Sequence, residues 1–142
     1  IPQVHLPGSR AAPARPARIA AEVLAIGTSA GVDLGVLRAA LVASPANSNF
    51  VERDVLSILE NGDYDEGFAI ALACKDLGLS IDLARSVGMP AELSALVEQI
   101  FRRARANYGD RAGEMVPFRL YEDLLGGPLR LPADTAITEG AR

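Results

Sequence analysis

The chain has 142 residues and a mass of 14.9 kDa, the size of one domain that can bury a single hydrophobic core. Hydrophobic residues make up 49% and charged residues 23% of the sequence, a balance typical of a folded domain and not of a disordered chain. The net charge of −4 leaves no overall excess of positive charge to neutralise phosphates, so it argues against binding of nucleic acid. A single cysteine, Cys74, and a single histidine, His5, exclude an intramolecular disulfide and most zinc sites.

The hydropathy pattern argues against a membrane as partner. No uncharged apolar stretch reaches about 18 residues, and residues 1–7 have no signal-peptide core, so we expect a cytoplasmic protein. The first residue is Ile1 and not Met, and a fragment of a longer gene product is therefore one interpretation.

Residues 1–18 hold four prolines, too many for an intact helix or a central strand, and are predicted to form an extended arm rich in proline, alanine and arginine. From about residue 17, apolar residues recur at helical spacing and predict a first helix. Its apolar stripe consists of Ile19, Val23, Leu24 and Ile26. Gly31 is placed for a left-handed helix cap, Asp33 can cap a second helix, and Ser44-Pro45 ends that helix.

Three more helices are expected in the second half of the chain, after a short one over residues 50–60 that ends at Asn61-Gly62. The longest apolar element covers residues 68–87 and closes at Gly88, and Pro90 can start the next helix, which runs to about residue 108. The core stripe of that helix is expected at Leu93, Leu96, Val97, Ile100 and Phe101, and its solvated face at Glu98, Arg102, Arg103 and Arg105. A last short helix over residues 117–125 ends at Gly126, and residues 127–142 are expected to form a loosely held tail.

The pattern of these elements predicts the fold class. No run alternates with the period of two that marks a half-buried strand, and the connections between helices are short. We therefore predict an all-α fold, a compact bundle of five to six helices over residues 19–126, between the arm and the tail.

The acidic loop at residues 61–66 invites a calcium interpretation, and the spacing of its residues argues against one. An EF-hand loop needs glycine at its sixth position, here Glu66, and a carboxylate at its twelfth, here Leu72. We predict no metal site. Instead, Asp65 or Glu66 is expected at the start of the following helix, where a carboxylate complements the helix dipole.

Two further features are predicted to be structural. Cys74 lies in the apolar run with no histidine near it in the sequence, which favours a buried, inert thiol over a nucleophile. The basic residues between 102 and 111 are flanked by Glu98, Asp110 and Glu114, which is typical of a solvated helix face.

Lys75 is the only lysine in the sequence, and with Asp76 it interrupts an element that is otherwise apolar. Helical spacing places it on one face with Phe68, Leu72, Leu79 and Asp82. Its ammonium group would therefore project from an apolar surface. Two interpretations stay open: the side chain reaches water or a carboxylate at a helix interface, or it makes a functional contact outside this helix.

Four segments of the chain carry a resemblance to a known family. In order they are Ala20-Ala21-Glu22-Val23-Leu24-Ala25-Ile26-Gly27, then Ala30-Gly31-Val32-Asp33, then Gly67-Phe68 followed by Lys75-Asp76-Leu77-Gly78-Leu79, and Gly88-Met89-Pro90. Together they resemble the C-terminal helical domain of the β-hydroxyacid dehydrogenases, which include 3-hydroxyisobutyrate dehydrogenase, tartronate semialdehyde reductase and relatives of 6-phosphogluconate dehydrogenase. The resemblance covers about residues 19–125 and is most specific over residues 68–79.

The resemblance implies an oxidoreductase in which an N-terminal Rossmann domain binds NAD or NADP. The helical domain of such enzymes supplies one wall of the active-site cleft and most of the subunit interface, so the resemblance also implies a homodimer or a larger homo-oligomer. By its place in the motif, Lys75 would contact the cofactor and Phe68 would lie beside it. A lysine at the edge of an apolar wall is chemically suited to the polar or phosphate groups of a cofactor.

The sequence departs from the family pattern before Ile19. There the family has a catalytic lysine and then an asparagine pair, whereas residues 11–18 hold neither. Arginine is a poor substitute in proton transfer, because it stays protonated. The Rossmann half with its glycine-rich turn is also missing. No catalytic residue is therefore assigned, and the chain by itself is expected to be inactive.

Two hypotheses follow for the function. In the first, the chain is the isolated or truncated C-terminal domain of an NAD(P)-dependent β-hydroxyacid dehydrogenase, the Rossmann half is its partner, and the cofactor does not bind tightly to this chain alone. In the second, the chain is a non-catalytic helical oligomerisation module; the scarcity of charges in residues 68–87 suits burial in a subunit interface as well as in a domain core. Dinucleotide binding that depends on Lys75 would separate them.

Overall fold

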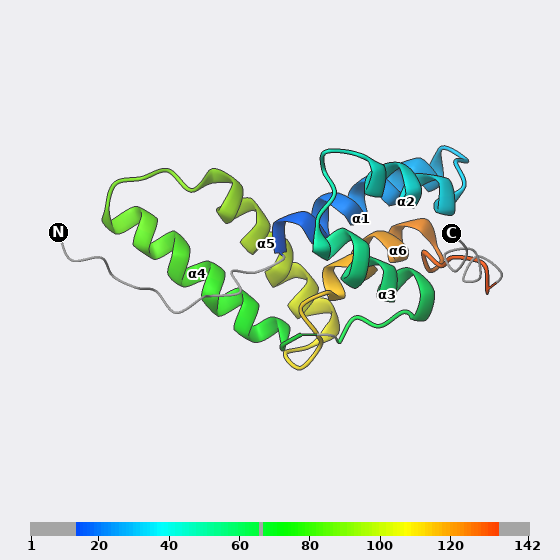
Figure 1. Ribbon diagram of the computed structural model, residues 1–142. Helices are drawn as coiled ribbons and strands as arrows, with labels where there is room; N and C mark the ends of the chain where they lie inside the picture. Colours follow the sequence, from blue (N-terminus) through cyan, green and yellow to red (C-terminus); the bar gives the residue numbers. More distant parts are fainter. Residues whose placement is uncertain (1–13, 66, 134–142) are drawn as a thin grey trace.

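The computed structural model describes residues 14–65 and 67–133, and over these ranges the chain is helical (Figure 1). A π-helical turn, η1 (Phe50–Asp54), precedes the third α-helix, and a 3-10 turn, η2 (Val116–Phe118), precedes the sixth. No strand forms in these ranges, which confirms the all-α prediction. The α-helices are α1 (Ala14–Ser29), α2 (Leu34–Ala43), α3 (Val55–Asn61), α4 (Ile70–Ser86), α5 (Glu92–Tyr108) and α6 (Arg119–Leu125).

The helices enclose two hydrophobic cores. In the first, side chains from α1, α3 and η2, such as Leu24, Ile58 and Phe118, pack with residues of α2 and η1. In the second, α4 packs against α5, with Ile70 and Phe101 among its fully buried side chains. The helices α4 and α5 form a hairpin beside the remaining helices (Figure 1). Among the described residues, no helix has the length and apolar character needed to span a membrane.

Short sequence signals mark where helices begin and end, as expected. The carboxylate of Asp33 caps α2 by accepting a hydrogen bond from the backbone N–H of Val36 at 3.0 Å. Gly62 and Gly126 adopt left-handed conformations directly after α3 and α6, with φ of 68° and 73°. Glycine reaches this region without the steric penalty that a Cβ atom brings, so these two residues stop their helices.

The first helix begins at Ala14, three residues earlier than expected, and thus includes part of the predicted arm. Pro16 lies in the first turn of α1, where proline is tolerated because a backbone N–H has no partner within the helix in any case. The remainder of the predicted arm, residues 1–13, lies outside the described residues.

The buried faces of α1 and α5 differ from two expectations. In α1, Ile19 and Ile26 are 59% and 63% exposed, and the core contacts come from Ala20, Ala21, Leu24 and Ala25. The small alanines let neighbouring helices approach closely. The packed face of α1 is therefore the alanine face, although the isoleucines are the larger apolar side chains. In α5, Leu93 and Leu96 are exposed because they lie toward the hairpin turn, where no helix of the described chain covers them.

The prediction that Glu98 lies on the solvated face of α5 is wrong, because this residue is buried. Its carboxylate forms an ion pair with Arg102 one turn later and accepts a hydrogen bond from the Gln99 amide at 3.0 Å. A buried carboxylate needs such partners to offset the loss of water.

The segment after α6 is anchored, in contrast to the loosely held tail that we expected. Leu129 is buried in the first core, and the backbone N–H of Leu131 donates to the carbonyl oxygen of Leu59 at 2.8 Å. A single leucine is too short a pattern to predict burial from the sequence, and a backbone hydrogen bond leaves no pattern in the sequence at all. Residues 134–142 of the predicted tail lie outside the described residues.

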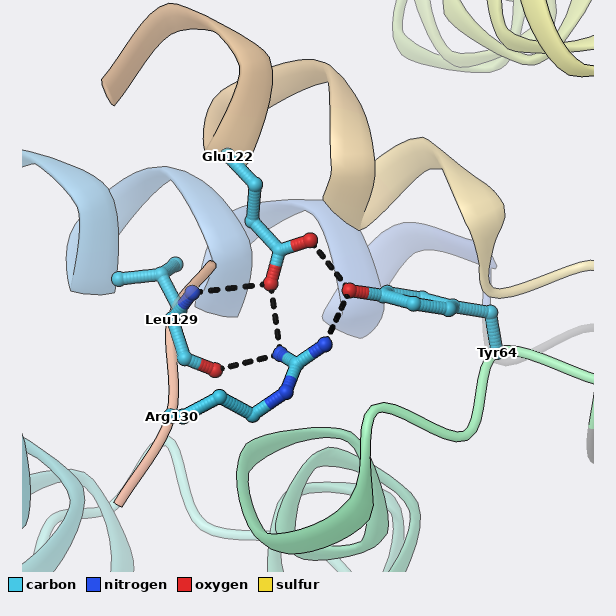
Figure 2. Close-up of polar contacts among 4 residues, drawn as sticks. All are labelled: Tyr64, Glu122, Leu129 and Arg130. Atoms are coloured by element: carbon cyan, nitrogen blue, oxygen red, sulfur yellow. Dashed lines mark hydrogen bonds and ion pairs between the residues drawn. The ribbon is translucent and has the colours of Figure 1, made fainter. Parts of the chain in front are cut away.

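A polar network holds this segment in place (Figure 2). Glu122 of α6 is buried and accepts hydrogen bonds from the Leu129 backbone N–H at 3.0 Å, from Arg130 at 2.7 Å and from the Tyr64 hydroxyl. Arg130 also donates to the Tyr64 hydroxyl at 2.7 Å. The network ties α6, the segment after it and the α3–α4 loop to one another. Burial, reinforced by Glu122, raises the pKa of Tyr64, so this hydroxyl stays a donor at neutral pH.

Candidate functional site

Lys75 lies on an exposed face of α4. Leu72 and Leu79, one turn before and one turn after it, are 49% and 57% exposed. No carboxylate lies three or four positions away along the helix, and no ion pair to Lys75 forms among the described residues. The structure therefore places an exposed ammonium group on an apolar surface, with no carboxylate partner among the described residues; this agrees with a side chain that reaches water and leaves a functional contact outside the helix open.

Phe68 lies just before α4, on the segment that leads from the acidic loop into the helix. Its ring is half-buried and packs against the second core. Its carbonyl oxygen accepts a hydrogen bond from the backbone N–H of Glu114 at 2.9 Å, and the N–H of Ile70 donates to the carbonyl oxygen of Ala112 at 2.7 Å. Phe68 and Lys75 thus belong to one continuous stretch of chain. Residues 112–114 hold the beginning of this stretch through these two backbone hydrogen bonds. Contact of either residue with a cofactor stays a prediction.

Asp65, in the acidic loop, does not have the role at the start of α4 that we expected. Its carboxylate accepts a hydrogen bond from the backbone N–H of Gly113 at 3.0 Å, across 48 positions in the sequence. It thereby ties the α3–α4 loop to the α5–η2 loop and does not cap α4, which begins at Ile70. Residue 66 lies outside the described residues.

Glu114 is a residue that the sequence analysis did not assign to the site. It is 6% exposed, and its Oε2 atom makes no hydrogen bond within the described part of the chain. Burial, with a smaller contribution from the charge of Asp54, raises the pKa of Glu114 to about 7. No local pattern signals such a residue, because its surroundings come from η1 and the α3–α4 loop, far away in the sequence.

Cys74 points into the second core, on the opposite side of α4 from the exposed face. Burial raises the pKa of its thiol, which the nearby Arg105 and Arg102 only partly offset. A protonated, buried thiol is a poor nucleophile, which agrees with the predicted inert role.

Two of the three arginines of α5, Arg102 and Arg105, form ion pairs with carboxylates nearby. Arg105 forms two hydrogen bonds with Asp110, at 2.7 Å and 3.1 Å, and Arg102 is paired with Glu98. This side of α5 is a mixed surface, in agreement with the solvated face predicted for its arginines. In the described residues, no three His, Cys, Asp or Glu side chains gather in a way that could hold a metal ion.

Known proteins resemble this chain over most of its length. The family model described as the NAD-binding domain of NADP-dependent 3-hydroxyisobutyrate dehydrogenase matches residues 14–121. Among curated proteins, 2-(hydroxymethyl)glutarate dehydrogenase of Eubacterium barkeri is 27% identical over 106 residues, which cover 75% of this chain and 35% of that protein. L-threonate dehydrogenase of Cupriavidus necator is 40% identical over 85 residues, which cover 60% of this chain and 28% of that protein. The chain thus spans about a third of the length of these relatives.

Solved structures show the same fold. 3-Hydroxyisobutyrate dehydrogenase of Salmonella typhimurium matches 75% of this chain and 38% of its own with a TM-score of 0.65 and 24% identity. The enzyme of the same name from Mycobacterium tuberculosis, in a structure with L-serine, matches 75% of this chain and 39% of its own with a TM-score of 0.63 and 23% identity.

Proposed function

Since the chain belongs to the family of NAD-binding, C-terminal domains of 3-hydroxyisobutyrate dehydrogenases, we propose that it forms one wall of a dinucleotide site in an NAD(P)-dependent β-hydroxyacid dehydrogenase. The observation that carries the proposal is the ammonium group of Lys75, which lies on the exposed face of α4 and forms no ion pair with another described residue. The second core holds the other side of this helix, so the position of Lys75 is fixed by the packing of α4 on α5.

The chemistry of this face fits a dinucleotide. An ammonium group that lacks a carboxylate partner can donate to phosphate or hydroxyl oxygens without first breaking an ion pair. Leu72 and Leu79 on either side offer apolar surface to a ring or a ribose and reduce the access of water. When bound, the nicotinamide cofactor supplies the acceptor or donor of the hydride.

Phe68 has a supporting role in this proposal. Its ring is anchored in the second core, and its backbone is fixed by Glu114, so it can border the cofactor without being reoriented. Residues 11–18 contain no lysine, and Lys75 is the only lysine of the sequence. We therefore assign to this chain the binding and orientation of the cofactor, and no proton transfer to the substrate.

The single lysine gives a direct test. Reductive methylation with ¹³C-formaldehyde labels Lys75 and the terminal amine alone, so NMR follows one side-chain signal during titration with NADP⁺ and then NAD⁺. We expect the Lys75 signal to shift in a saturable way, with a dissociation constant on the order of 1 mM for the isolated chain. In the unlabelled protein, Lys75→Gln should weaken binding about tenfold, because a charge-assisted hydrogen bond is lost.

Arg103→Gln is the matched control, since it removes one positive charge from an exposed position on α5. It should leave the affinity unchanged. Equal losses in the two variants would mean that the dinucleotide responds to net charge only, and a Lys75 signal that does not move would refute the proposed contact.

We also propose that the α4–α5 hairpin is an interface between copies of this chain. Large apolar side chains gather on the hairpin and stay exposed in the single chain. Outside the face around Lys75 they are Leu83, Val87, Met89, Leu93 and Leu96. Exposed apolar residues in such number are unusual for a monomer, and a second copy would remove them from water. The non-catalytic oligomerisation module, our second candidate function, rests on the same observation.

Leu83→Glu tests this interface. Leu83 is 65% exposed, so the charge should leave the fold intact while it weakens self-association at least about tenfold. Leu124→Glu is the matched control, because Leu124 is 80% exposed on α6, away from the hairpin. Sedimentation velocity at micromolar concentration should show an oligomer for the wild type and the control. A monomeric wild type would contradict the proposed interface.

A further inference from the structure

Residues 112–114 act as a brace for the stretch that carries Phe68. Three backbone N–H groups make the connection: Ile70 donates to Ala112, Glu114 donates to Phe68, and Gly113 donates to the carboxylate of Asp65. The donor–acceptor distances are 2.7 Å, 2.9 Å and 3.0 Å, all within the normal range. The same stretch also pairs Ala69 with Gly113 in an isolated bridge.

The carboxyl group of Glu114 lies inside this brace. A Cβ atom at Gly67 would lie 2.5 Å from its Oε1 atom, so the carboxyl sits directly against the backbone that leads into Phe68. Gly67 has a φ of +112°, which also favours glycine. The Oε2 atom is buried and makes no hydrogen bond within the described residues. A carboxylate in this position would have one oxygen that is both desolvated and without a hydrogen bond to another described residue.

Two negative groups lie on the segments packed around Glu114, and one of them, Asp54, adds to this cost. Asp54, at the end of η1, acts on the carboxyl by repulsion. Asp65, in the α3–α4 loop, directs one oxygen to the Gly113 N–H and is a second negative group on the same brace. Among the described residues, no arginine or lysine forms an ion pair with Glu114. The neutral carboxylic acid is therefore the form that fits the folded brace.

We propose that Glu114 is a positioning residue that makes the placement of Phe68 depend on pH: the protonated carboxyl keeps the brace closed, and its ionisation loosens residues 67–70. The consequence for the cofactor rests on the proposed function, whereas the loosening of the brace does not.

The direction of the effect follows from proton binding. The pKa of Glu114 is raised to about 7 in the folded chain from its ordinary value of 4.5. Between these values the folded chain keeps a proton that the unfolded chain has released, so the contribution of this group to stability falls as pH rises through this window. Above about pH 7 the loss is complete, and the carboxylate remains buried or moves toward water, with the loop displaced.

Amide hydrogen exchange tests the proposal without any cofactor. In the wild type, the protection of the Ile70, Gly113 and Glu114 amides, corrected for the intrinsic rate, should fall about tenfold between pH 5.5 and pH 8.5. Amides in the middle of α1 and α5 report on global unfolding in the same sample. In Glu114→Gln, a neutral isostere of the protonated acid, the three brace amides should keep their protection across this range.

Two more variants sharpen the test. Asp54→Asn removes the repulsion and should move the midpoint of the wild-type transition to lower pH, without abolishing it, because burial is the larger cause. Glu60→Gln, at an exposed position, should behave like the wild type. In thermal denaturation, the Tm of Glu114→Gln should exceed that of the wild type by about 5 °C at pH 8.5 and by less at pH 5.5.

The proposal is overturned if the brace amides of Glu114→Gln lose protection with the same midpoint as the wild type. It is also overturned if Glu114→Gln changes Tm while the brace amides respond no differently from those of α1 and α5, because Glu114 would then affect stability without positioning Phe68. If Lys75 does not bind a dinucleotide, the amide exchange and the Tm values would be unaffected.

Discussion

Gly113→Ala is expected to remove at least about 3 kcal/mol from the free energy of unfolding. A Cβ atom at this buried position would lie 2.1 Å from the carbonyl oxygen of Tyr64 and 2.5 Å from the Cα atom of Asp65. Both atoms belong to the backbone, so no side-chain rotation relieves the clash. The α3–α4 loop would have to move away from residues 112–114, with loss of the hydrogen bond between Gly113 and Asp65.

Urea denaturation followed by circular dichroism measures this loss, and Gly78→Ala provides the matched control. Gly78 lies within α4 with no atom near the place of a Cβ, so alanine there should stabilise the domain by about 0.5–1 kcal/mol through its helix propensity. The same substitution thus has opposite effects at the two sites. A loss below about 1 kcal/mol for Gly113→Ala would mean that the two loops separate easily, and would weaken the case for a brace.

Glu122→Ala is expected to lower the free energy of unfolding by about 3 kcal/mol. The substitution leaves the buried N–H of Leu129 without its acceptor and Arg130 without its carboxylate partner. Arg130 is partly exposed, so water recovers some of its lost interaction, which keeps the effect at the lower end for a buried ion pair. The segment after α6 should detach from α6 and from the α3–α4 loop.

Thermal and urea denaturation of Glu122→Ala should show the loss, and Glu60→Ala, at an exposed position on α3, should stay close to the wild type. Tyr64→Phe removes one hydroxyl from the same network and should cost about 1 kcal/mol. Limited proteolysis locates the effect, because cleavage after Arg130 should become faster in Glu122→Ala. If Glu122→Ala costs no more than Tyr64→Phe, the network does not anchor this segment.

The two parts of the molecule that matter for the proposed function thus depend on different interactions. The place of Lys75 depends on the apolar packing of α4 against α5, whereas the place of Phe68 depends in addition on polar contacts from the α5–η2 loop. Core substitutions should therefore affect Lys75 through global stability. Conditions that change the charge of Glu114 should act first on Phe68.

The sequence by itself determined the helices, their ends and the family resemblance. Asp33 caps the start of α2, and Gly62 and Gly126 end α3 and α6, all through interactions within a few residues; such short-range effects can be recognised in a sequence. The exposed face around Lys75 was also predictable, since spacing along one helix places Leu72, Lys75 and Leu79 together.

Only the tertiary structure decided which apolar faces are buried and which carboxylates are enclosed. Ile19 and Ile26 look like core residues, yet the alanines beside them make the close contacts. Glu114 and Glu122 look like surface residues, yet partners from distant parts of the chain enclose them: Tyr64 meets Glu122 across 58 positions. Burial and pairing of this kind arise when separate helices pack. Hydrophobic periodicity describes each helix alone, so it carries no information about which neighbour covers a given face.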